Sequence, residues 1–456
     1  MTNTSGILDA ARQRRTVVAD ALRSRLWPVP ALGVVAAVIA GVAIPELDGT
    51  LDPAMPQTVA GYLFSGGPDA ARELLGAIAT ALITVTSLTF SLTLITLQLA
   101  SSQYTPRLLR TFAADRFVQR TLALFLATFV YAITVLRTVR NSAAGPDFVP
   151  QISVTVAYLL AMGSVLALVL FLGHLVRQIR IETMLGHVAA DAKNTAHRLL
   201  EPADEYSYDV TPTPPAEASI INARSSGFLV EVDERALLAA AVDADAVIWV
   251  ERPVGSDIVA GVPVAFSWSA TSALSLDEER LTTVRERVTG ALNIGIERTA
   301  TQDIGYGLRQ LTDVVIRALS PGINDPTTAV HGLNSCSAIL CELTGYRLGR
   351  RILRDKNQVL RVVLARPDLS DLLDLVCTQP QHYGASDPAV LARLLSMLRE
   401  LAWVVTLPGH RNAVADRLRQ LETLAAEQGF DAVERRRFDQ LAHQVREALD
   451  RRWTPT

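Results

Sequence analysis

Hydroxyl side chains recur along one apolar stretch of the sequence, residues 74–100. At about 100° per residue, which is the turn of an α-helix, several of them fall within a single stripe. The members of this stripe are Thr80, Thr84, Ser87, Ser91 and Gln98. Hydroxyl and carboxamide groups along one face of a membrane helix can line a polar path. The chemistry that these residues predict is therefore conduction of an ion or a small solute.

A second stripe of threonines lies on nearly the opposite side of the same predicted helix. It comprises Thr86, Thr89, Thr93 and Thr96. Ser and Thr hydroxyls can bond to the carbonyl one turn earlier, so one polar face is also compatible with simple packing in a helix bundle. Two opposed stripes predict a helix that packs against bundle partners on one side and faces a polar path on the other.

An arginine-containing segment, "TPRLLR", follows this helix. Pro106 is expected to end the helix, and Leu108 and Leu109 alternate with Arg107 and Arg110. One interpretation places this amphipathic segment along the inner membrane surface. The other makes Arg107 and Arg110 part of a gate or collar at the inner mouth of an oligomeric pore.

The string "SPGINDPTTA" predicts the end of one helix, a turn and the start of another helix. Asn324 or Asp325 could cap the second helix, because Pro326 suits its first position. Alternatively, oxygens of Asn324 and Asp325 could hold a cation or another ligand, with Asp303 and Arg309 of the preceding helix in the same site. The sequence leaves both interpretations open.

Motifs of the common enzyme classes are missing from the sequence: it has no phosphate-binding loop, no nucleophile elbow and no HExxH pair. The seven histidines are scattered without metal-ligand spacing, and the turn "RPVGSD" offers no lysine for an attached cofactor. The three cysteines, Cys336, Cys341 and Cys377, lack CxxC spacing and are expected to be small core residues. We therefore expect no enzyme: no catalytic residue, no metal and no cofactor.

Four stretches are long and apolar enough to cross the hydrocarbon core, which takes about 20 residues. They are residues 26–45, 74–100, 121–136 and 152–176. Lys and Arg gather before the first stretch, between the second and third, and after the fourth, whereas the other side has only Arg72, Arg137 and Arg140. Because positive charge marks the cytoplasmic side, both termini are predicted to be cytoplasmic.

Changes in composition predict the domain boundaries. They give a basic cytoplasmic segment (1–25), a four-helix transmembrane domain (26–180), a helical extension with a Pro-rich linker (181–219), a small β module (220–270) and a cytoplasmic helical domain (271–456). Short runs such as "AVIWVE" and "GVPVAFSW", separated by turn signals, predict a compact β-barrel-like module. The fold class is thus a membrane α-helical protein with a cytoplasmic region that combines this module with an all-α module.

Several strings along the chain carry a family resemblance. The most specific is "QDIGYGLRQLTDVVIRALSPGINDPTTAVHG", accompanied by "SLTLITLQLASSQYTPRLLR" and "QHYGASDPAVLARLL". With them, nearly the whole sequence resembles the bacterial predicted membrane proteins grouped as the domain of unknown function 2254 family. The resemblance implies a multi-pass protein of the bacterial inner membrane with this four-helix topology. It implies no catalytic role.

The sequence as a whole favours an oligomeric inner-membrane channel or transporter, gated or assembled by its cytoplasmic region. Its expected partners are the lipid bilayer, further copies of the same chain, and an ion or small solute. The net charge of −3 gives no reason to expect a nucleic-acid partner. The alternative is a membrane-anchored sensor or scaffold, in which the helices only anchor and the cytoplasmic region binds a partner.

Overall fold

The protein is represented by a computed structural model whose chain divides into two compact units, Met1–Arg180 and Ile181–Thr456. The structure describes residues 27–51, 63–103, 115–140, 148–178, 180–203, 213–272 and 274–455.

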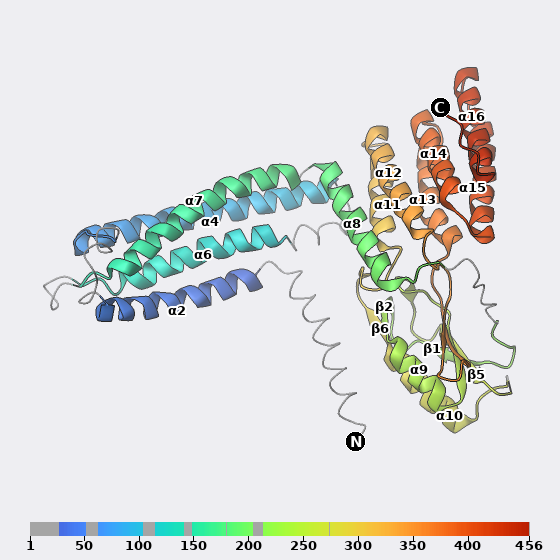
Figure 1. Cartoon of the computed structure of the whole chain (residues 1–456), viewed down its shortest axis with the longest axis horizontal. Helices are drawn as coiled ribbons and strands as arrows, with labels where there is room; N and C mark the ends of the chain where they lie inside the picture. The colour runs from blue at the N-terminus through green and yellow to red at the C-terminus, as the bar shows by residue number, and fades with distance from the viewer. Residues whose placement is uncertain are drawn as a thin grey trace. The chain divides into compact units, whose positions relative to one another are not determined.

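Four long helices make up the described part of the first unit (Figure 1). They are α2 (Pro28–Leu51), α4 (Pro68–Gln103), α6 (Arg116–Leu136) and α7 (Gln151–Gln178). Each is long and apolar enough to cross a membrane. The prediction of four spanning helices is therefore confirmed at the level of length and composition, and the helices extend beyond most of the predicted ends.

Helix α6 packs against α2, α4 and α7. Its most extensive packing is against α2, where the small residues Gly33, Ala37 and Gly41 recur at four-residue spacing. A Cβ atom at Gly41 would lie 2.8 Å from the Cβ of Thr134 on α6, so only glycine fits there. Small residues at this spacing let two membrane helices gain van der Waals contact along their backbones.

Two aspartates tie the ends of α7 to its neighbours. The buried Asp48 of α2 accepts hydrogen bonds from the backbone N–H of Ile152 (3.0 Å) and Ser153 (2.9 Å) and from the Ser153 hydroxyl (2.6 Å). It thereby satisfies amides of the α7 N-terminus that have no partner inside the helix. Near the other end, Asp115 caps α6 and lies 2.7 Å from the Nε2 atom of His174 on α7.

The second unit contains nine helices among its described residues. They are α8 (Ile181–Leu199), α9 (Glu234–Asp243), α10 (Glu278–Ala291), α11 (Tyr306–Ala318), α12 (Pro326–Leu343), α13 (Leu369–Gly384), α14 (Pro388–Val404), α15 (Pro408–Glu427) and α16 (Ala432–Leu449). Helix α8 packs against α11 and α12. A Cβ atom at Gly307 of α11 would lie 2.5 Å from the Cβ of Ala192, so α8 and α11 approach too closely there for any side chain at position 307.

Eight strands are found in the described part of this unit. They are β1 (Ser219–Asn222), β2 (Gly227–Val232), β3 (Ala246–Val250), β4 (Asp257–Ile258), β5 (Pro263–Ser269), β6 (Leu292–Gly295), β7 (Arg351–Arg354) and β8 (Leu360–Leu364). One sheet has the order β1-β5-β3-β8-β7 and the other β4-β2-β6. In the first, only β3 and β8 are parallel.

The predicted β-barrel-like module is wrong, because both sheets are open and the described strands form no closed barrel. The predicted all-α module over 271–456 is also wrong in part, since β6, β7 and β8 lie within it. Strand β8 is distant from β3 in the sequence but pairs with it in parallel. The sheet therefore includes strands from outside the predicted β module.

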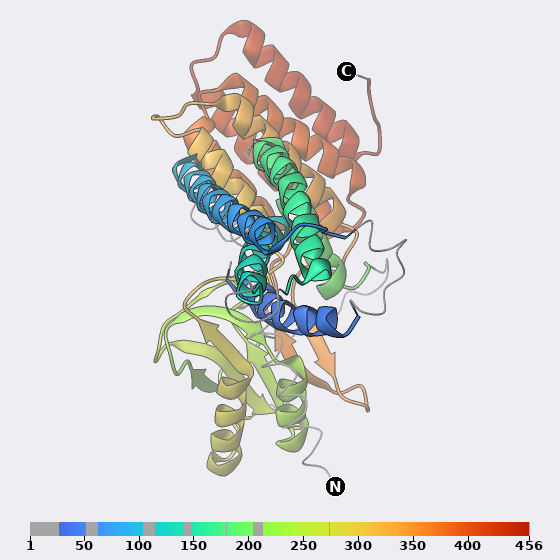
Figure 2. The ribbon, with the colours of Figure 1, turned by 90° about the vertical axis from the view of Figure 1, so that its left-hand side faces the viewer.

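Every residue of β3 is buried, as expected for a strand covered on both faces. Ile248 and Val250 contact the core formed with α9 and α10, whereas Trp249 packs with Trp268 and Val363 on the opposite face. Figure 2 shows α9 and α10 beside the strands at one end of the second unit, with α11 to α16 at the other end.

Candidate functional site

The structure separates the two polar stripes of α4. Thr89, Thr93 and Thr96 of the second stripe are buried, with exposed fractions of 0%, 7% and 7%. All members of the first stripe are exposed on the surface of the four-helix unit, namely Thr80, Thr84, Ser87, Ser91 and Gln98. The inner threonines therefore serve the packing of the bundle, and the predicted path residues face outward.

Hydroxyls of both stripes donate to the carbonyl one turn earlier. The distances are 2.8 Å from Thr93 Oγ1 to Thr89 O, 2.9 Å from Thr80 Oγ1 to Gly76 O, and 3.0 Å from Thr84 Oγ1 to Thr80 O. Each of these hydroxyl oxygens keeps acceptor capacity for another group. Exposed apolar side chains flank the outer stripe: Ile83, Leu88, Phe90, Leu94 and Ile95.

The predicted gate residues, Arg107 and Arg110, lie outside the described residues, as does the basic segment 1–25. Their roles stay predictions.

Asp325 is the N-cap of α12. Its Oδ1 atom accepts a hydrogen bond from the backbone N–H of Thr328 (3.1 Å), and Pro326 occupies the first turn. Asn324 has a positive φ of 49°, a left-handed conformation that asparagine tolerates better than most residues. Of the two interpretations of this motif, the capping geometry is the one that the local structure displays.

The other two residues of the proposed ligand set lie elsewhere. Asp303 precedes α11 and Arg309 lies in its first turns, whereas Asn324 and Asp325 follow its far end. Helix α11 has 13 residues. At 1.5 Å per residue, Asp303 lies about 20 Å and Arg309 about 14 Å along the helix axis from the end that Asn324 and Asp325 follow, so a single ion cannot contact all four residues.

Asp303 belongs to a buried joint within the second unit. Its exposed fraction is 4%; it forms an ion pair with Arg298, and it accepts the Gly305 N–H at 3.0 Å. Burial raises the pKa of the Asp303 carboxyl, and the nearby guanidinium of Arg298 opposes that shift. The preceding Gln302 side chain accepts the backbone N–H of Val232 in β2 at 2.9 Å. The motif "QDIGYG" thus connects strand β2 to the start of helix α11.

Replacing Asp325 by alanine is expected to lower the free energy of unfolding by about 1 kcal/mol, because the α12 cap is lost. Hydrogen bonds from the side chain and backbone of Thr328 lower the pKa of Asp325. The stabilisation is therefore present at neutral pH and is lost as the pH falls below about 4, through the lowered folded-state pKa.

The matched variant is Asp325→Asn, which keeps a capping oxygen but does not titrate. Unfolding curves of the full chain at pH 7 and pH 3 should show a larger acid-induced loss for the wild type than for Asp325→Asn. Equal losses in the two proteins would contradict this role of the carboxylate.

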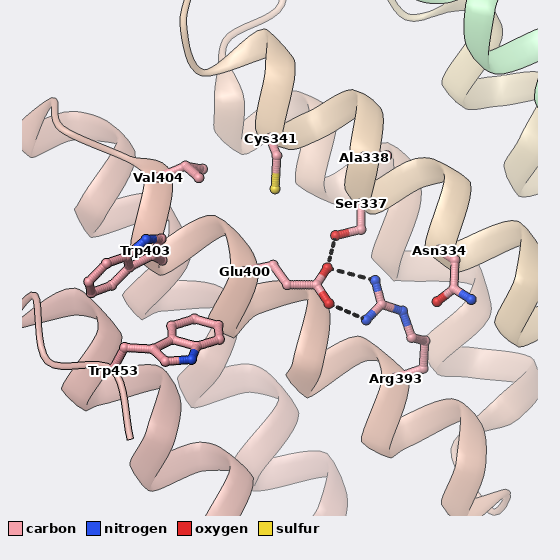
Figure 3. Close-up of a pocket in the computed structure, with 9 residues that line it drawn as sticks. All are labelled: Asn334, Ser337, Ala338, Cys341, Arg393, Glu400, Trp403, Val404 and Trp453. Carbon is pink, nitrogen blue, oxygen red and sulfur yellow. Dashed lines mark hydrogen bonds and ion pairs between the residues drawn. The ribbon is translucent and has the colours of Figure 1, made fainter. Parts of the chain in front are cut away.

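A pocket of about 450 Å³ lies between α12, α14 and the C-terminal tail (Figure 3). It is lined by Asn334, Ser337, Ala338, Cys341, Arg393, Glu400, Trp403, Val404 and Trp453. Its size is that of typical small-molecule sites. Its walls come from three segments, so no local sequence pattern predicts it. The local signal is limited to Arg393 and Glu400, seven residues apart on one face of α14.

One end of the pocket is polar. The Arg393 guanidinium donates to both Glu400 oxygens, at 2.6 Å to Oε1 and 2.8 Å to Oε2, and the Ser337 hydroxyl also donates to Oε2. Burial by itself would raise the pKa of Glu400, but the hydrogen bonds from Arg393 and Ser337 outweigh it and lower that pKa. The carboxylate is therefore ionised at neutral pH.

The opposite end is aromatic. Trp403 and Trp453 meet edge to face with ring centroids 5.5 Å apart. Arg399 lies over the Trp453 ring, with its central carbon 4.0 Å from the centroid. The tail that carries Trp453 is fixed by a bond from Arg399 to the Thr454 carbonyl and by the Thr454 hydroxyl, which donates to Glu447 at 2.8 Å.

The three cysteines differ in exposure. Cys336 and Cys377 are fully buried, whereas Cys341 is partly exposed at the pocket. Burial raises the pKa of Cys336 to about 12 and that of Cys341 to about 11. Each of these two thiols is therefore protonated at neutral pH and is a poor nucleophile.

Four helices that are long and apolar enough to span a membrane, followed by a large mixed unit, are the pattern of a multi-pass membrane protein. The chain belongs to the family described as Predicted membrane protein (DUF2254), whose model matches residues 23–400. An uncharacterized protein of Mycobacterium bovis and another of Mycobacterium tuberculosis are each 34% identical over 424 residues, which cover 91% of this chain and 79% of the relative. No solved structure matches the chain.

Proposed function

We propose that the protein is a homo-oligomeric channel or transporter of the bacterial inner membrane, in which α4 lines a path for an ion or small solute. The observation that carries this proposal is the outward position of Thr80, Thr84, Ser87, Ser91 and Gln98. Both termini and the second unit would lie in the cytoplasm, as the distribution of Lys and Arg predicts. The proposal assigns no catalytic residue.

We place the path between copies of the chain because large buried side chains occupy the middle of a single four-helix unit. Leu75, Phe125 and Phe171 are fully buried and Tyr131 is nearly so. A carboxamide such as that of Gln98 has two donors and an acceptor, which hydrocarbon cannot satisfy. If the first stripe of α4 faced the central axis of an oligomer, these groups would lie in water. The apolar side chains on either side of the stripe would then pack against neighbouring subunits.

Cysteine substitution tests this arrangement. In a Cys341→Ala background, Ser87→Cys and Ser91→Cys channels in a planar bilayer should lose current when a charged, water-soluble thiol reagent is added. Thr93→Cys, on the buried stripe of the same helix, is the matched control and should keep its current. An oligomer should also appear in detergent, with disulfide cross-links between copies of Ser91→Cys.

Silence of the wild-type protein under voltage, tension and ligand, or a monomer in detergent, would contradict conduction. Those outcomes favour the second candidate, a membrane-anchored sensor or scaffold. The specific support for that candidate is the pocket between α12 and α14, which has the size and mixed lining of a ligand site.

A further inference from the structure

We propose that the pocket between α12, α14 and the tail binds an organic amine with an aromatic or other apolar body. The ammonium group would sit near Glu400, and the apolar body would lie against Trp403 and Trp453. This inference does not rest on conduction, because it concerns a site within the second unit.

The polar end of the pocket favours a ligand group that donates hydrogen bonds over one that only accepts them. A carboxylate offers about four acceptor positions, and Glu400 uses three of them, one at Oε1 and two at Oε2. One acceptor position on Oε1 is therefore available to a ligand. The Arg393 guanidinium directs its two terminal nitrogens at Glu400, so an anionic ligand would meet the carboxylate rather than a free cation.

The aromatic end favours a positively charged or apolar ligand. Indole faces attract cations, and Arg399 already occupies one face of Trp453 in this manner. Trp403 and Trp453 are 39% and 46% exposed, and Val404 beside them is 38% exposed, so they form an accessible apolar wall. Figure 3 shows both rings at the end of the pocket away from Arg393. Two indoles and a carboxylate around one space resemble the aromatic cages that bind organic ammonium groups.

The wall is built into the fold rather than formed by a loose end. Arg451 donates to the carbonyl of Val405 at 2.8 Å and to that of Trp403. Together with the bonds at Thr454, these contacts hold Trp453 in place before any ligand arrives. Preorganisation of this kind lowers the entropic cost of binding.

The test uses two molecules of the same shape and opposite charge, phenylethylamine and 3-phenylpropionate, with the full-length protein in detergent. Titration calorimetry should show saturable binding of phenylethylamine, and fluorescence of the two exposed pocket tryptophans, Trp403 and Trp453, should change with the same affinity. Equal binding of 3-phenylpropionate, or no binding of either molecule, would overturn the proposal.

Variants locate the site. Glu400→Gln and Trp453→Ala should each weaken phenylethylamine binding by about tenfold or more, whereas Trp453→Phe, which keeps an aromatic face, should lose less. The exposed Glu427→Gln is the surface control and should bind as the wild type does. Circular dichroism identifies any variant that fails to fold. If a folded Trp453→Ala protein bound phenylethylamine with unchanged affinity, the amine would bind elsewhere and the proposal would be wrong. This outcome is decisive even if Glu400→Gln could not be purified.

Discussion

Replacement of Asp303 by alanine is expected to lower the free energy of unfolding of the second unit by about 3–5 kcal/mol. Arg298 is only 19% exposed at its side chain, and its partner carboxylate is 3% exposed. Without Asp303, the guanidinium is left buried and unpaired, and the Gly305 N–H loses its acceptor. Gly255 packs directly over this pair, which leaves little room for rearrangement.

Thermal and denaturant unfolding of the full chain, followed by tryptophan fluorescence, measures this effect, since Trp249 and Trp268 are buried in the same unit. The control is Asp416→Ala, which removes the exposed i, i+3 partner of Arg419. Surface pairs contribute about 0–1 kcal/mol, so the control should unfold almost as the wild type does. Similar stability of the two variants would show that Asp303 is not part of a buried joint.

The second large effect is expected in the first unit. Asp48→Ala should destabilise the four-helix bundle by about 3 kcal/mol, because two backbone N–H groups and one hydroxyl lose their acceptor at once. Asp48 is completely buried, so water cannot easily take its place. The loss would free the N-terminus of α7 from the end of α2.

A graded series makes this prediction specific. Ser153→Ala removes only the hydroxyl contact and should cost less, and Asp48→Asn, which keeps one acceptor oxygen, should fall between the two. Glu46→Ala, at an exposed position of the same helix, is the neutral control. Thermal unfolding in detergent, followed by circular dichroism, gives the order of stability of these variants. An Asp48→Ala protein as stable as Glu46→Ala would refute the tie between α2 and α7.

The four spanning helices could be predicted because a single local quantity, the length of an apolar run, decides them. The start of α12 could also be predicted locally, because Asp325 and Pro326 suit an N-cap and a first helical turn. The two faces of α4 followed from helical periodicity alone, although periodicity could not say which face is buried. Packing against α6 and α7 decides that, and it buries Thr89 and Thr93.

The β architecture and the pocket could not be predicted in this way. Strand β8 pairs with β3 across more than a hundred residues, and no local pattern in "QVLRVVLA" identifies that partner. The barrel prediction is wrong because local patterns identify the strands of residues 220–270 but not the distant strand that pairs with them. The pocket depends on Glu400, Cys341 and Trp453 meeting from three segments, and each of these residues alone has an ordinary structural explanation.

The close packing of α8 against α11 and α12 restricts its movement. The chain crosses from one unit to the other once, between Arg180 and Ile181. Because Gly307 abuts Ala192, and Glu342 of α12 holds Lys193 at 2.6 Å, α8 cannot slide without carrying its neighbours along. Helix α12 also supplies Cys341 to the pocket. A displacement of α8 would therefore reach the pocket through a single packed helix.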